Sequence, residues 1–84
     1  MEKRYFVVIG GKWFDKVNGN TYNTAKIIEP KTRATFYTQF TYGYGSSYLT
    51  EAIEELKRRG IENFDIIDGG SFYLKKADCK NGNF

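Results

Sequence analysis

A single helical segment stands among stretches that otherwise predict strands, and this limits the fold more than any other feature of the chain. Among the 84 residues, four apolar side chains share the helical spacing i, i+3, i+4, i+7: Leu49, Ala52, Ile53 and Leu56. Ser46 or Ser47 is a candidate N-cap, and Gly60 stands where a helix ends in a left-handed residue. One helix with one apolar stripe can cover one face of a sheet, so we expect a single domain, residues 1–84, of that kind.

The other segments are rich in β-branched and aromatic residues, which is typical of strands. The predicted strands cover residues 3–17, 20–29 and 34–40 before the helix, and residues 62–68 and 71–77 after it. The glycine pair at residues 10–11 predicts a bulge or bend within the first strand rather than its end. The predicted order is βββαββ, an α+β fold with a small, mostly antiparallel sheet and one helix packed on one face.

The pair Asn18-Gly19 predicts the turn between the first two strands. A two-residue type I′ loop needs positive φ at both central positions, and Asn and Gly tolerate that conformation best. With such a loop Val17 faces Asn20, and Trp13 faces Thr24. This register determines which side chains share a face of the sheet.

The two faces of the predicted sheet differ in composition. The helix side is apolar and consists of Phe14, Ala25, Ile27, Phe36 and Phe40. The opposite side is aromatic, basic and hydroxylated and consists of Trp13, Asp15, Tyr22, Thr24, Lys26, Ile28 and Tyr37. Such a mixture is typical of a surface that meets a partner, because Trp and Tyr combine a flat apolar face with a polar tip. The alternatives are cross-strand aromatic pairs that stabilise an exposed sheet, or a C-terminal tail that folds over this face.

The glycine-rich loop TYGYGSS, residues 41–47, precedes the helix. Phosphates bind before helix N-termini, but this loop lacks both the Lys-Ser/Thr ending of a P-loop and the glycine spacing of a dinucleotide site. Tyr42, Tyr44 and Tyr48 either pack within a tight strand-to-helix connection or are presented to a partner, in the way that binding loops use Tyr, Gly and Ser.

The chain offers few residues for catalysis or metal binding. It has no histidine, and its single cysteine, Cys79, lies in a polar segment without an imidazole to activate it. Asp65 and Asp68 lack the ligand spacing of a calcium loop, whereas an aspartate before Gly-Gly is typical of a turn cap. We therefore expect no enzymatic activity, no metal site and no cofactor.

Cysteine content and charge bear on the compartment and the partners. A single cysteine cannot form an intramolecular disulfide, so a reducing, cytoplasmic compartment is expected, and no apolar run approaches the ~20 residues of a membrane span. The net charge of +3 is uneven, since residues 1–47 carry +4 and residues 48–84 carry −1. The basic half suits contact with nucleic acid or with an acidic protein surface, although a charge of this size also fits solubility alone.

The segments KWFDKVNGNTYNTAKI and FTYGYGSSYLTEAIEELKRRG together resemble small proteins encoded by phages and prophages of Gram-positive bacteria. The shared pattern is Phe-Asp-Lys, Asn-Gly-Asn-Thr-Tyr, then Tyr-Gly-Tyr-Gly and a short helix, and it covers about residues 13–60. Some phage proteins of this size inhibit bacterial defence, including anti-CRISPR proteins. The resemblance therefore implies an inhibitor that acts in the host-cell cytoplasm, and it assigns no role to any single residue.

Two functional hypotheses are consistent with these features. The first is a non-enzymatic inhibitor that binds a host protein or nucleoprotein defence complex and blocks it sterically. Its predicted binding residues are Trp13, Tyr22, Lys26, Tyr37, Tyr42 and Tyr44. The alternative is a small nucleic-acid-binding module, in which the same aromatics stack on bases and the phosphates are held by Lys12, Lys16, Lys26, Lys31 and Arg33. The sequence favours no particular target and no particular oligomeric state.

Overall fold

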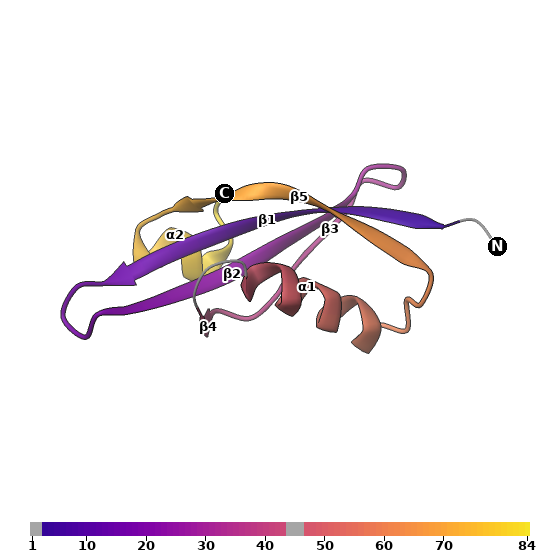
Figure 1. Cartoon of the computed structure of the whole chain (residues 1–84). Helices are drawn as coiled ribbons and strands as arrows, with labels where there is room; N and C mark the ends of the chain where they lie inside the picture. Colours follow the sequence, from indigo (N-terminus) through magenta and orange to yellow (C-terminus); the bar gives the residue numbers. More distant parts are fainter. Residues whose placement is uncertain (1–2, 44–46) are drawn as a thin grey trace.

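Five strands and two helices make up the described part of the chain, residues 3–43 and 47–84 of this computed structural model. In chain order they are β1 (Arg4–Asp15), β2 (Asn20–Glu29), β3 (Ala34–Tyr37), β4 (Thr41–Tyr42), α1 (Ser47–Arg58), β5 (Phe64–Tyr73) and α2 (Lys76–Asn81). The strand order is β3-β2-β1-β5, and β4 pairs with β2 beyond the end of β3 (Figure 1). Among these strand pairs β1–β5 is parallel and the others are antiparallel. The expected α+β fold, a mostly antiparallel sheet with a helix packed on one face, is therefore confirmed.

The hydrophobic core lies between α1 and one face of the sheet (Figure 1). Its buried members are Phe6, Val8, Ala25, Ile27, Tyr48, Ala52 and Leu56. Phe6 contacts Phe36 and Phe64 edge-on, with ring centroids 6.2 and 6.1 Å apart. Because Phe36 belongs to β3 and Phe64 to β5, both outer strands contribute to the same core.

The buried row of α1 is centred one position away from the predicted stripe. Ala52 and Leu56 are fully buried as expected, but Leu49 and Ile53 are only half-buried. Tyr48, which the sequence left open, is the third buried residue of the helix. The helix ends as predicted, since Gly60 adopts a φ of 82°. The candidate cap Ser46 lies outside the described residues.

The glycine pair in β1 lets an aromatic ring lie against the backbone on each face of the sheet. A Cβ at Gly10 would lie 2.7 Å from the Tyr48 ring, and a Cβ at Gly11 would lie 2.6 Å from the ring of Phe84. Successive residues of a strand face opposite sides, so Tyr48 and Phe84 pack on opposite faces. As predicted, β1 continues through this pair.

The register of the β1–β2 hairpin is two residues away from the prediction. The observed pairs include Asp15 with Asn20 and Trp13 with Tyr22. The loop therefore has four residues, 16–19, rather than two, and φ is positive at Gly19 (69°) but not at Asn18. A shift of two residues leaves each side chain of the two strands on its predicted face, because side chains alternate with a period of two.

The Asp15 carboxylate explains the longer loop. It accepts hydrogen bonds from the backbone N–H groups of Val17 (3.0 Å) and Asn18 (3.3 Å) and from the Asn18 side-chain amide (2.8 Å). The Asn18 side chain is the main cause of the lowered pKa of Asp15. A turn organised by an aspartate side chain therefore replaces the tight type I′ turn.

One long strand, β5, takes the place of the two short strands predicted after the helix. It runs through Gly69-Gly70, where its register with β1 shifts by one residue. Asp68 accepts a hydrogen bond from the Gly70 N–H (2.8 Å), but this contact lies at the irregularity inside a continuous strand and not in the predicted turn between two strands. The chain after Tyr73, predicted to continue as a strand, forms α2 instead.

α2 and the segment after it cover the hairpin half of the second sheet face. The Cys79 Sγ lies 3.1 Å from the Gly11 carbonyl oxygen, and the Phe84 ring lies over the same glycine. The prediction that one helix leaves the second face without cover is therefore wrong for this half. The alternative that the C-terminal segment folds over this face holds there.

Two residues assigned to the helix side do not pack against α1. Phe14 lies beyond the helix and is 45% exposed. Phe40 is on the opposite face, where its ring stacks on Tyr22. The pairing with β2 stops after Tyr37 and resumes at Thr41, so the alternation assumed for a continuous strand does not reach Phe40.

Candidate functional site

Four aromatic side chains gather on the second face of the sheet, near the hairpin. They are Trp13, Tyr22, Phe40 and Tyr42, and this cluster is called the aromatic surface. Tyr22 is central, with its ring centroid 5.2 Å from that of Phe40, 5.6 Å from that of Trp13 and 5.8 Å from that of Tyr42. Tyr42 is 55% exposed and the other three rings are half-buried. The cluster lies outside the α1 core and presents apolar area to solvent.

Strand pairing places three of these rings in one row. Trp13 of β1 is opposite Tyr22 of β2, and Tyr22 is in turn opposite Tyr42 of β4. Directly opposed residues of neighbouring strands share a face, which brings their side chains into contact. Phe40 joins the row from the irregular segment 38–40 between β3 and β4. The two-residue strand β4 therefore completes the aromatic surface.

α2 borders the aromatic surface with a basic side chain. The Lys76 Nζ lies 5.1 Å from the centroid of a Trp13 ring, in the range of a cation–π contact. The same ammonium group contributes to the lowered pKa of Asp15, although hydrogen bonding from Asn18 contributes more. Lys76 thus ties the first turn of α2 to β1 at the edge of the cluster.

The predicted site residues Lys26 and Tyr37 form a separate group beside the aromatic surface. The Lys26 Nζ donates a hydrogen bond of 2.5 Å to the Phe84 carbonyl oxygen, and the Tyr37 ring lies 6.3 Å from that of Phe84. A Cβ at Gly82 would lie 2.7 Å from the Tyr37 ring, so the C-terminal segment rests directly on this side chain. Lys26 and Tyr37 therefore hold the segment after α2, while predicted residue Tyr44 lies outside the described residues.

The structure brings Trp13, Tyr22 and Tyr42 together as one surface. It adds two residues that the sequence reasoning missed, Phe40 and Lys76. Phe40 was missed because a continuous third strand was assumed through Thr38. Lys76 was missed because residues 71–77 were predicted as a strand; the lack of β-branched residues in 76–81 and the following Gly82 are compatible with a short helix but do not specify one.

Polar side chains elsewhere in the described residues connect the helices to the sheet. The Tyr48 hydroxyl donates a hydrogen bond of 2.7 Å to Asp68, which lowers the pKa of Asp68, while burial is the main cause of the raised pKa of Tyr48. Burial likewise raises the pKa of the Cys79 thiol. In the part of the chain that is described, no three Asp, Glu or Cys side chains lie together as metal ligands would. The thiol is thus held protonated in a closed site, and the phenol–carboxylate contact joins α1 to β5.

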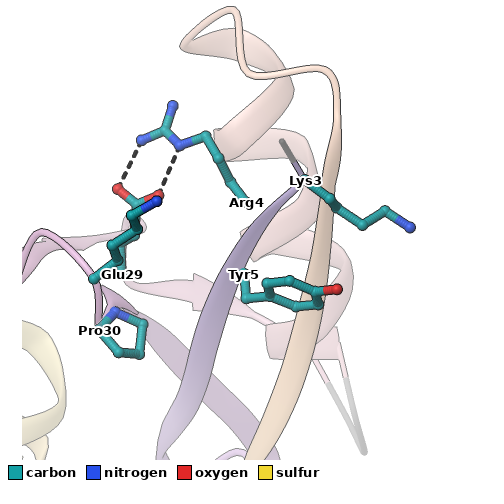
Figure 2. Close-up of a pocket in the computed structure, with 6 residues that line it drawn as sticks. Lys3, Arg4, Tyr5, Glu29 and Pro30 are labelled. Carbon is teal, nitrogen blue, oxygen red and sulfur yellow. Dashed lines mark hydrogen bonds and ion pairs between the residues drawn. The ribbon is translucent and has the colours of Figure 1, made fainter. Parts of the chain in front are cut away.

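A shallow hollow of about 320 Å³ lies at the opposite end of the sheet (Figure 2). Figure 2 shows Arg4 facing Glu29, with two hydrogen bonds of 2.7 and 2.8 Å between them. Lys3 extends away from this pair and forms an ion pair of 3.1 Å with Asp65. The hydrogen bond from Arg4 is the main cause that lowers the pKa of Glu29 to about 2. Arg4 and Lys3 are therefore both paired with carboxylates of the chain itself. These two ion pairs connect β1 to β2 and to β5.

Comparison of the chain with protein-family models, with curated proteins and with solved structures found no match. The aromatic surface is therefore judged by its own geometry. Within the described residues, neither helix is long and apolar enough to cross a membrane.

Proposed function

We propose that this protein is a non-enzymatic inhibitor that docks through its aromatic surface on a protein of a bacterial defence complex and blocks that complex sterically. The observation that carries the proposal is the gathering of four rings at one place on the sheet, outside the core that stabilises the fold. Interfaces concentrate their binding energy in a few such aromatic side chains. The class of target rests on the resemblance to small phage proteins.

The orientation of the rings favours a protein partner over bare nucleic acid. A base-stacking platform needs an accessible ring face. Tyr22 and Phe40 are stacked on each other, with an angle of 9° between their planes, and Trp13 contacts both of them and the Lys76 ammonium. The rings therefore form a packed group that suits docking into an apolar recess of a protein.

The cations of the nucleic-acid alternative do not form one phosphate-binding track. Lys12 lies over the rings of Tyr48 and Tyr73, and Lys26 is bound to Phe84. Lys16 belongs to the β1–β2 loop, whereas residues 31 and 33 belong to the β2–β3 turn at the other end of β2. These two turns lie at opposite ends of β2, a strand of ten residues that spans about 33 Å, so the five cations are not gathered at one place.

A plasmid-interference assay in a Gram-positive host with an active CRISPR system tests this proposal. Expression of the wild-type protein is expected to restore transformation by a targeted plasmid, and a double variant W13A/Y42A is expected to lose that effect. Phe14→Ala is the matched control, because Phe14 is an exposed aromatic on the other face. Wild-type protein that protects no targeted plasmid would overturn the class of target, and a double variant that still protects would overturn the role of the aromatic surface.

A further inference from the structure

The whole net charge of the protein lies at the end that carries the aromatic surface. This hairpin end comprises residues 10–24 and 71–84, which hold five lysines and two aspartates and so carry +3. The rest of the chain holds eight Lys or Arg residues and eight Asp or Glu residues and is neutral. The lysines of the hairpin end are Lys12, Lys16, Lys75, Lys76 and Lys80.

The two aspartates of the hairpin end, Asp15 and Asp78, are already included in this net charge of +3. The Asp15 carboxylate is committed to the loop hydrogen bonds described above. Lys16, Lys75 and Lys80 are exposed, and the structure records no ion pair between them and other described residues. Lys76 and Lys80 are four residues apart and project from the same side of α2. Exposed lysines therefore share the hairpin end with the aromatic surface, and Lys76 is in direct contact with it.

We infer that the partner of the aromatic surface is an acidic protein surface, with carboxylates placed around an apolar recess. The inference rests on the proposed function and specifies the charge of the partner's surface. Opposite charges around an apolar centre provide complementarity and faster association. Surfaces that bind nucleic acid are basic, so a basic docking end is repelled by the nucleic-acid channel of a defence complex. The protein does not imitate nucleic acid, and it docks on an acidic face outside that channel.

The single tryptophan, Trp13, gives a direct readout of binding at this site. Three probes are titrated, each of about 15 residues or nucleotides. They are a Glu-rich peptide with a central Tyr-Leu pair, the same peptide with Lys in place of Glu, and oligothymidylate. The Glu-rich peptide is expected to change Trp13 emission and to bind about tenfold more weakly when NaCl is raised from about 0.05 M to 0.5 M, since salt screens exposed charges. The Lys-rich peptide is expected not to bind. Oligothymidylate that binds more tightly than the Glu-rich peptide would overturn the inference in favour of nucleic acid.

Charge reversal separates this inference from the proposed function. The test variant is Lys16→Glu with Lys80→Glu, and the matched control, with the same change of net charge, is Lys57→Glu with Arg58→Glu at the end of α1. The test pair is expected to lose both the binding of the Glu-rich peptide and protection in the plasmid assay, and the control pair is expected to keep both. Native circular dichroism spectra verify that both pairs are folded. If W13A/Y42A abolishes protection while the lysine pair retains it, the aromatic surface still docks on the target but the partner is not acidic.

Discussion

The two faces of the sheet are covered in different ways. α1 covers its face with a row of large apolar contacts, from Tyr48 over Gly10 to Leu56 at the core. On the second face, a helix of six residues and the Phe84 ring rest on Gly11, and the neighbouring buried side chains include polar Thr24 and Cys79. Apolar burial is the dominant stabilising term in folding, so the α1 face provides most of the stability of this small domain. The second face, by contrast, keeps the aromatic surface partly exposed to solvent.

Leu56→Ala tests the α1 face and has the largest expected effect on stability. Leu56 is fully buried, so its truncation removes transfer free energy and leaves a cavity. We expect the free energy of unfolding to fall by about 2–5 kcal/mol, measured by urea denaturation. Ile53→Ala on the half-buried flank of α1 is the control and is expected to cost less. Equal effects of the two changes would show that α1 is not docked through its buried row.

Trp13→Ala tests the second face and is expected to affect binding more than folding. Hot-spot aromatics contribute about 2 kcal/mol or more to an interface, whereas a half-buried ring outside the core contributes less to stability. Once the target protein is identified, the variant is expected to bind it at least about 30-fold more weakly, by calorimetry, while circular dichroism remains native. A variant that unfolds would instead assign Trp13 to the stabilising part of the molecule.

Sequence reasoning predicted the α1 face better than the second face. The period of Ala52 and Leu56, the placement of Ile27 and Phe36 on the helix side and the left-handed Gly60 follow from local rules of spacing and backbone conformation. The position of Phe40 depends on an interruption of strand pairing at residues 38–40, which no local pattern indicates.

The C-terminal helix was missed for a related reason. Its six residues carry little helical periodicity, and it is held by tertiary contacts with Gly11 and Trp13. The placement of Trp13 and Tyr22 on one face was predictable from alternation alone, since the register error of two residues preserves parity. Tyr42 joins them through β4, a strand that lies within the predicted glycine-rich loop. The cover of that face by the C-terminal segment was one of the alternatives that the sequence left open, and the sequence did not decide between them.

Gly11→Ala tests whether the two faces open independently. The added methyl group would lie 2.6 Å from the Phe84 ring, so this ring must shift from its place beside α2. We expect a local opening that costs about 1–2 kcal/mol and exposes the buried Cys79 thiol. The rate of reaction of Cys79 with a thiol reagent should rise about tenfold, while the urea midpoint changes less than in Leu56→Ala. A rise in reactivity that strictly follows global unfolding would show instead that the faces form one cooperative unit.

Acid provides the mildest test, and the carboxylate with the largest pKa shift belongs to an ion pair at the far end of the α1 face. Arg4 and Glu29 join the start of β1 to the end of β2, and Arg4 also lies over the Phe6 ring of the core. The pKa of Glu29 is about 2 in the folded protein, below its ordinary value of 4.5. The unfolded state therefore binds the proton more readily. The stabilisation is therefore fully present above about pH 4.5 and is lost as pH falls towards 2. The midpoint of thermal unfolding should decrease over this range.

Glu29→Gln isolates that contribution from the other carboxylates. The variant lacks the titrating group, so its midpoint should be lower than that of the wild type near neutral pH, and the difference between the two proteins should shrink as pH falls from 4.5 to 2. A constant difference across this range would mean that Glu29 stabilises the fold through packing rather than charge. Because the pair lies on the α1 side, the reactivity of Cys79 in α2, compared between wild type and variant at one neutral pH, should remain the same. A change in that reactivity would show that the ends of the two faces are coupled through β1 and β2, which both faces share.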